Sequence, residues 1–198
     1  MDPKRSYHHG DLRAALIQAA RTALETTAPE ALSLRELAEQ LGVSRAAPYR
    51  HFADRRALLS EVAAQGFEAL AQAYDRARAE AADPQAALRG TARAYLGLAF
   101  GQPGLFRLMF DSDILGADAP ASLLGPARAA WESQRAAVAA ADPGADAATL
   151  NRRAITGWST LHGFIALTQG ERLKGFMTEP LTEAELVEAI IEKTLRAD

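Results

Sequence analysis

The chain has 198 residues and a formal net charge of −3, so one or two domains with a sizeable core are possible. It contains no cysteine, which excludes disulfides and thiolate metal sites. The first residues include no apolar run, so a signal peptide is excluded. The longest uncharged stretch, residues 154–170, is too short and too polar to span a membrane. We expect a cytoplasmic protein with no membrane partner.

Charge and residue type both vary along the chain. Residues 1–56 hold nine Lys or Arg against seven Asp or Glu, a net charge of +2, whereas the remainder holds thirteen against eighteen, a net charge of −5. A basic first part and an acidic remainder suggest two different tasks. Alanine is abundant, β-branched residues are few and no period-2 alternation of strand length occurs, so the sequence predicts an all-α fold.

The chain starts with an arm, residues 1–9, that would either contact DNA through Lys4, Arg5 and Tyr7 or serve as a solubilising tail. A first helix is predicted from Asp11 to Thr26. Its apolar positions recur at a spacing of three or four residues, as in a helix that packs one face on a core.

Residues 33–52 carry the pattern of a helix-turn-helix. Ser33 can cap a first short helix, and Glu36 stands three residues later, where it can complete a capping box. Gly42 supplies the left-handed turn that ends this helix. Ser44 is predicted to cap a second helix, whose exposed positions carry side chains that bind phosphate. Two short capped helices joined by a glycine turn are typical of DNA-binding proteins.

The remaining predicted elements are mostly helices. Asp54 can cap a helix that continues to Ala82, and at 1.5 Å per residue it would be roughly 40 Å long, enough to link two domains. Gly125-Pro126 marks either a kink or a late start in a later helix. The later elements are helices over Pro84–Phe100, Pro120–Ala140, Ala147–Gln169 and Thr182–Arg196, a short apolar segment over Leu105–Phe110, and loops at 101–104, 111–119 and 170–180.

Several of these segments together resemble one known family. The run from Leu12 to Phe67 resembles the N-terminal domain of TetR-type transcriptional regulators. The matching residues are Ala19-Ala-Arg21, Leu34-Arg-Glu-Leu-Ala38, Gly42-Val-Ser44, Tyr49-Arg-His-Phe52 and Leu58-Leu59. Two further segments, Tyr7–Leu12 and Gly157–Gly163, resemble one branch of that family, the second through its Trp-x3-His-Gly pattern.

This resemblance implies an N-terminal three-helix DNA-binding domain, residues 10–70 with the motif at 33–52, and a larger helical ligand-binding and dimerisation domain, residues 71–198. It also implies a homodimer that binds double-stranded operator DNA and is released from it by a small-molecule effector. Repression is the usual mode of the family. Such a protein is not an enzyme and needs no cofactor or metal.

The second helix of the motif would enter the major groove and present its N-terminal residues to base edges. Arg45 is the candidate for bidentate contact with guanine, and Ala46 for contact with a thymine methyl. Arg50 would reach a phosphate or a base, and Arg55 stands where the family usually has a phosphate-binding lysine. Pro48 is tolerated because few helical hydrogen bonds precede it. The predicted DNA-binding residues are Ser33, Ser44, Arg45, Ala46, Tyr49, Arg50, His51 and Arg55.

Aromatic and large apolar side chains crowd the second half of the chain. They would either line a pocket for an apolar or amphipathic ligand or form an ordinary hydrophobic core. His162 would hydrogen-bond across the interior, contact a ligand or lie at a dimer interface, and no second ligand at zinc-like spacing supports a metal role. The candidate ligand-binding residues are Phe100, Phe106, Met109, Phe110, Trp131, Trp158 and His162.

The last two long helices are the candidate dimer interface. Gly157 and Gly163 would allow another helix to approach closely. Two such helix pairs would form a four-helix bundle about a two-fold axis. The alternative is that these faces close only the core of the monomer. The apolar stripes are Ile155, Trp158, His162 and Ile165 on the first helix and Leu186, Val187, Ile190 and Ile191 on the second.

The leading hypothesis is a ligand-responsive DNA-binding repressor. One alternative is a DNA-binding dimer that has no small-molecule ligand. Another is a small helical enzyme that uses His162 with a nearby carboxylate, but the sequence shows no nucleophile-base spacing, no phosphate-binding loop and no metal cluster.

Overall fold

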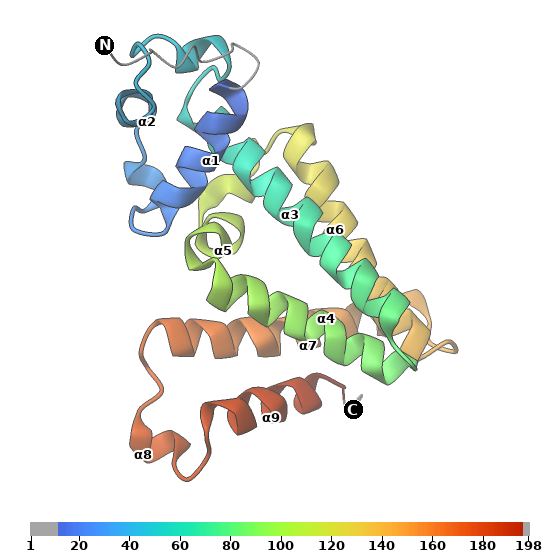
Figure 1. The fold of residues 1–198 in the computed structure, drawn as a ribbon. Coiled ribbons are helices and arrows are strands. Elements are labelled where there is room, and N and C mark those ends of the chain that lie inside the picture. Colours follow the sequence, from blue (N-terminus) through green and yellow to red (C-terminus); the bar gives the residue numbers. More distant parts are fainter. Residues whose placement is uncertain (1–11, 196–198) are drawn as a thin grey trace. The chain divides into compact units, whose positions relative to one another are not determined.

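The computed structural model describes residues 12–195, and every regular element in this range is a helix, which confirms the all-α prediction (Figure 1). The predicted arm at 1–9 lies outside the described residues. The α-helices are α1 (Leu12–Leu24), α2 (Leu34–Gln40), α3 (Arg55–Glu80), α4 (Pro84–Gly101), α5 (Pro103–Phe110), α6 (Ala121–Ala141), α7 (Ala147–Gln169), α8 (Gly175–Thr178) and α9 (Glu183–Leu195). The 3-10 helices are η1 (Pro29–Ala31), η2 (Pro48–Arg50) and η3 (Asp113–Leu115).

The described helices divide into two compact units. The first unit comprises the chain up to Phe67 together with Gln102–Ala127, and the second comprises Glu68–Gly101 together with the chain from Arg128 onward. The chain therefore passes through the first unit twice. The boundary expected from the sequence, at residue 70, lies close to the first division. A boundary at residue 70 assigns residues 102–127 to the second domain. In the structure these residues belong to the first unit, where they pack with the N-terminal helices.

Side-chain caps set the starts of the long helices where the sequence predicts them. The carboxylates of Asp54, Asp83 and Asp146 each accept a hydrogen bond from the N–H three residues later, at 2.8, 2.8 and 2.7 Å. At α9, Thr182 N–H donates to Glu185 Oε2 at 2.8 Å while Glu185 N–H donates to Thr182 Oγ1 at 3.3 Å, a complete capping box. These bonds favour the ionised carboxylates and lower the pKa of Asp146 and of Glu185.

The core of the first unit is built around α5. Most of its apolar side chains are almost fully buried, with Phe106 and Met109 each 1% exposed. Two glycines let the neighbouring helices approach closely. A Cβ on Gly104 would lie 2.2 Å from the backbone oxygen of Leu24, at the end of α1, and a Cβ on Gly66 of α3 would lie 2.5 Å from Met109 Sδ. Such contacts leave no space between α1, α3 and α5.

In the second unit α4, α7 and α9 pack against one another (Figure 1). Arg89 Nε lies 2.8 Å from Glu192 Oε1, and Arg93 NH2 lies 2.9 Å from Glu188 Oε1, so two ion pairs join α4 to α9. Elsewhere in the fold, α6 begins at Ala121 and continues through Pro126. The helix therefore does not begin as late as Gly125-Pro126, which the sequence had left possible.

The apolar stripe predicted for α7 does not lie on one exposed face. Ile155 is 49% exposed, but Ile165 is 1% exposed, and Trp158 and His162 are half-buried in the second unit. On α9, Ile191 is fully buried. The spacing of apolar residues correctly indicated a face of each helix, but spacing does not say what covers that face. Here the monomer covers Ile165 and Ile191 and leaves Ile155 exposed, and the other residues of the two stripes are half-buried.

Candidate functional site

The first helix of the motif, α2, has a defined start and a defined end. Ser33 Oγ accepts a hydrogen bond from the N–H three residues later at 3.4 Å. At the other end Gly42 has a φ of +68°, and its N–H bonds to Glu39 O at 3.1 Å while Val43 N–H bonds to Ala38 O at 3.0 Å. This pair of bonds is the Schellman motif. It reverses the chain direction and delivers the segment that follows to the surface.

The second helix of the motif is not the α-helix that Ser44 would cap, so that prediction is wrong. The segment is a turn followed by the 3-10 helix η2. Ala47 N–H bonds to Ser44 O at 2.9 Å, and His51 N–H bonds to Pro48 O at 2.9 Å. Pro48 has no N–H to donate to Ser44 O, so the bond that would close the first α-helical turn after a Ser44 cap is missing. The helical dihedral angles of Ala47, φ −61° and ψ −42°, keep the path of the chain compact.

This segment places most of the predicted DNA-binding side chains on the surface. Pro48 and Phe52 are buried beneath it, and the Arg13 guanidinium lies 5.4 Å from the Phe52 ring centroid. Burial of these two residues anchors the short helix, although it has few backbone bonds of its own. The exposed candidates are Ser44, Arg45, Ala46, Tyr49, Arg50 and Arg55, and the half-buried ones are Ser33 and His51.

Arg45, the candidate for reading a base, is held by an acidic neighbour. Its Nε donates to Glu39 Oε1 at 2.7 Å, and its NH2 contacts the same oxygen. The two side chains are 73% and 53% exposed. An ion pair this exposed contributes only about 0–1 kcal/mol, so Arg45 can leave Glu39 for another acceptor at little cost.

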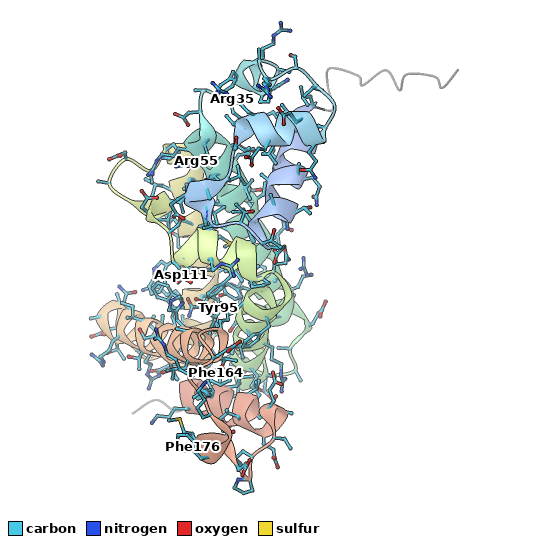
Figure 2. All side chains as sticks on the ribbon, turned by 90° about the vertical axis from the view of Figure 1, so that its left-hand side faces the viewer. Arg35, Arg55, Tyr95, Asp111, Phe164 and Phe176 are labelled. Atoms are coloured by element: carbon cyan, nitrogen blue, oxygen red, sulfur yellow. The ribbon has the colours of Figure 1, made fainter. Side chains whose placement is uncertain are left out.

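Two further arginines flank the motif (Figure 2). Arg55, at the start of α3, is exposed and donates to the backbone oxygen of Glu30. Arg35 is exposed on the first turn of α2 and is absent from the set predicted from the sequence. The sequence could have indicated this residue, because Arg35 lies two residues after the Ser33 cap and the N-terminal end of a helix is a favourable place for a phosphate.

A chain of polar bonds crosses the interior of the second unit. Trp158 Nε1 donates to the hydroxyl of Tyr95 at 2.8 Å, and that hydroxyl lies 2.9 Å from His162 Nδ1. Tyr95 is only 2% exposed (Figure 2). Because the indole N–H can only donate, the Tyr95 oxygen accepts there, and its own proton can be donated to His162 Nδ1 when that nitrogen carries no hydrogen. The two residues of the Trp-x3-His pattern thus fasten α7 to α4 through one tyrosine.

The candidate ligand-binding residues fall in both units. Phe106 and Met109 are core residues of the first unit, and Phe100 packs edge-on against Phe164 in the second, with ring centroids 6.3 Å apart. The first unit holds Phe106, Met109 and Phe110, and the second holds Phe100, Trp131, Trp158 and His162. Their role in ligand binding remains a prediction.

Family comparisons agree with this architecture. Residues 16–62 match the model of the bacterial regulatory proteins of the tetR family, and residues 88–194 match the tetracyclin repressor-like C-terminal domain. The chain belongs to the TetR family. Members of this family are DNA-binding transcriptional regulators and not enzymes, and this holds for the present TetR-family protein. No curated protein matches the sequence.

Solved structures share the fold of this TetR-family regulator over nearly the whole chain. A Rhodococcus sp. RHA1 protein of unknown function is 32% identical, with a TM-score of 0.80 and coverage of 98% of both chains. The TetR family transcriptional regulator PfmR from Thermus thermophilus is 23% identical, with a TM-score of 0.67 over 92% of this chain and 97% of that one. A TetR-family transcriptional regulator from Bordetella parapertussis is 16% identical, with a TM-score of 0.68 over 94% and 95%.

Within residues 12–195, no helix is both long and apolar enough to cross a membrane. The same part of the chain brings together no group of three or more His, Cys, Asp or Glu side chains that could hold a metal ion.

Proposed function

We propose that this TetR-family regulator is a dimeric repressor that binds operator DNA through residues 33–55 and leaves it when a small-molecule effector binds. The observation that carries the proposal is the geometry of the motif. The Schellman turn at Gly42 delivers Arg45, Tyr49 and Arg50 to the surface above the buried Pro48. A regulator of this kind acts in the cytoplasm, where its operator is.

The exposed side chains of the motif divide into two roles at the operator. Arg45 leaves Glu39 and contacts guanine O6 and N7 with its guanidinium fork, and Ala46 lies low enough to touch a thymine methyl. Tyr49, Arg50 and His51 bind phosphate and set the register of the motif on the duplex. The remaining phosphate contacts come from Ser33, Ser44, Arg55 and, in addition to the residues predicted from the sequence, Arg35.

Dimer formation is supported by apolar side chains that the monomer leaves exposed. Ile155 and Leu167 of α7 are 49% and 42% exposed. Gly163, on the same helix, has no described atom within 4 Å of the position a Cβ would take, so the monomer's own packing does not require a glycine there. Phe176 in α8 is 81% exposed, and Met177 is 59% exposed (Figure 2). A second copy of this face, related by a two-fold axis, would cover these side chains.

The effector would act in the second unit. The Gly157–Gly163 segment, which resembles one branch of the family, supplies both residues that bind Tyr95. A ligand that displaced these bonds would loosen α7 from α4. The competing possibility is a DNA-binding dimer without a ligand, and it is tested below together with the position of the effector site.

Operator binding is tested by fluorescence anisotropy. The purified chain is titrated into a labelled fragment from its own promoter region, with an unrelated fragment of equal length as the control. At moderate salt, we expect the promoter fragment to bind at least about 10³-fold more tightly than the unrelated fragment. This ratio is at the lower end of the range for specific DNA-binding proteins. Equal affinity for the two fragments would contradict the proposed function.

Dimer formation is tested by light scattering after size exclusion. The wild type should have twice the 21.2 kDa mass of one chain, and Ile155→Asp should have the mass of one chain, because an unpaired carboxylate cannot be buried in an apolar interface. Ala148→Asp is the matched control, since Ala148 is an exposed residue in the first turn of the same helix. A monomeric wild type, or a dimeric Ile155→Asp, would contradict this interface.

A further inference from the structure

The second unit contains a cavity that the sequence does not predict. Its volume is about 460 Å³, and it lies between the start of α4, the end of α6, the first half of α7 and the end of α9. This volume is within the range of sites for small molecules, which is roughly 300–1,000 Å³. None of the aromatic residues proposed from the sequence lines this cavity, so its chemistry must come from other side chains.

The charged side chains of the lining are mostly cationic. Arg152 and Arg153 are adjacent on α7 and Lys193 comes from α9, whereas Asp142, at the turn after α6, is the only acidic residue among the described residues of the lining. Arg153 NH1 is paired with Asp142 Oδ2, and both side chains are about 30% exposed. The lining therefore carries a net positive charge even after this pair is formed. An anionic group is the natural occupant of such a site.

Two of the three threonine hydroxyls in the lining do not offer this anion a proton. Thr160 Oγ1 donates to Thr156 O at 2.9 Å, and Thr194 Oγ1 donates to Ile191 O at 2.7 Å, so both protons are used within their own helices. Arg152, by contrast, uses one NH2 group on Thr149 Oγ1, at 3.2 Å, and its guanidinium has further N–H groups. The two guanidinium groups therefore supply most of the N–H groups that can contact the anion, while Lys193 adds positive charge.

A narrower cavity of about 40 Å³ adjoins the first. The two share the lining residues Leu88, Val138, Arg153, Gly157, Thr194 and Leu195. The narrower one reaches Tyr74, Tyr95 and Trp158, all in the interior of the unit. A ligand that entered it would meet the polar chain that ties Trp158 and His162 to Tyr95. The combined site is cationic at one end and aromatic at the other.

The geometry points to a binding site for a small organic carboxylate with an apolar body. The carboxylate binds the fork of Arg152 or Arg153, and the apolar body lies toward Tyr95 and Trp158. A planar carboxylate matches the two parallel N–H groups of a guanidinium better than a spherical anion does. That this site is the effector site rests on the proposed function, whereas carboxylate binding itself does not.

The test uses the full chain and two carboxylates, phenylacetate and octanoate, each with its neutral amide, phenylacetamide and octanamide. Binding is measured by calorimetry and by the shift in thermal unfolding. We expect at least one carboxylate to bind saturably with a Kd below about 5 mM, and its amide to bind at least about tenfold more weakly. Failure of both carboxylates to saturate, or equal binding of acid and amide, would overturn the inference.

Two variants locate the binding. Arg152→Gln should weaken carboxylate binding at least about tenfold without loss of folding, because Arg152 is exposed and makes no ion pair among those found in the described residues. Arg153→Gln should do the same, but it also breaks the pair with Asp142. Arg76→Gln, an exposed arginine of α3 outside the lining, is the matched control and should bind as the wild type does. Wild-type affinity in both cavity variants would place the ligand elsewhere and overturn the inference.

The same samples are titrated with the labelled promoter fragment. Release of the fragment by the carboxylate, but not by its amide, would identify the cavity as the effector site. If the protein binds the promoter but no carboxylate, the inference fails and the proposed function stands. If it binds a carboxylate but does not distinguish the promoter from unrelated DNA, the proposed function fails and the binding site stands.

Discussion

The two units differ in how closely their helices approach. In the first unit, the positions of a Cβ on Gly104 and on Gly66 are already occupied, at 2.2 and 2.5 Å, by atoms of neighbouring elements. In the second, a cavity of about 460 Å³ separates four helices, and hydrogen bonds at Tyr95 replace some of the apolar contact. Gly90 approaches Ala77 closely there too, but outside the cavity lining. A closed core keeps a recognition surface in one shape, whereas a partly hollow, polar interior can adapt to a ligand.

The largest effect is expected where the closed core is broken. Gly104→Ala places a methyl group 2.2 Å from Leu24 O, and a backbone oxygen cannot turn aside as a flexible side chain can. We expect the free energy of unfolding to fall by about 1–3 kcal/mol, at the upper end of that range. Urea unfolding followed by circular dichroism measures it.

The control for this substitution is Gly97→Ala in α4, where no described atom lies within 4 Å of the Cβ position. Because alanine is the better helix former, this variant should be more stable than the wild type by up to about 1 kcal/mol. Equal unfolding midpoints for Gly104→Ala and the wild type would show that the first unit is less tightly closed than described.

The next largest effect is expected on operator affinity, at the DNA-binding motif that the closed core of the first unit supports. Arg45→Ala removes the proposed guanine contact, and we expect operator affinity to fall by about 1–3 kcal/mol, or about 5- to 150-fold. Affinity for unrelated DNA should change much less. Anisotropy titrations with both fragments measure the two effects, and an equal loss on both would assign Arg45 to phosphate instead.

Glu39→Gln tests the same contact of Arg45, but here we expect operator affinity to rise instead of fall. It removes the acidic partner of Arg45, and because that pair is worth only about 0–1 kcal/mol, operator affinity should rise by up to about fivefold. The rise should be absent in the double variant Arg45→Ala with Glu39→Gln. A rise that persists there would mean that Glu39 acts on DNA through its charge alone.

A smaller effect is expected in the second unit. Trp158→Phe deletes the N–H that donates to Tyr95 at 2.8 Å but keeps an aromatic ring. We expect a loss of about 0.5–1.5 kcal/mol in the free energy of unfolding. Trp131→Phe is the control, since Trp131 is also half-buried and makes no hydrogen bond to another described residue. Equal losses in the two variants would show that ring size, and not the bond to Tyr95, matters.

The smallest effect is expected at the capping box of α9. The hydrogen bonds from Thr182 lower the pKa of Glu185 in the folded state, so the ionised carboxylate stabilises the fold at neutral pH. This stabilisation is fully present above the ordinary pKa of a glutamate, about 4.3, and is lost as the pH falls through the lowered value. Glu185→Gln should therefore melt below the wild type at pH 7, and the difference should shrink as the pH approaches 3. A difference that is independent of pH would contradict this role.

Much of the local structure could be predicted because it depends on neighbours in the chain. Ser33 and Asp54 cap the helices expected of them, Asp83 and the Thr182–Glu185 box cap helices that begin where the sequence predicts, and Gly42 adopts the left-handed turn. Each of these features joins residues no more than a few positions apart. The prediction that Pro48 is tolerated in a second α-helix was wrong, because the segment from Ser44 onward is a turn followed by a 3-10 helix.

The sequence by itself determined the all-α fold, the capped first helix of the motif and the turn at Gly42, because periodicity, caps and turn residues act over a few positions. The family followed from the resemblance of its motif residues. Only the tertiary structure decided the partners of each apolar face. Residues 102–127 return to the first unit, Trp158 and His162 of the α7 stripe bond to Tyr95, and the cavity is lined by cations from distant elements. These outcomes depend on which faces meet in space. Spacing along one helix specifies a face but not its neighbour, so no reading of single segments could have placed Arg152, Arg153 and Lys193 around one cavity.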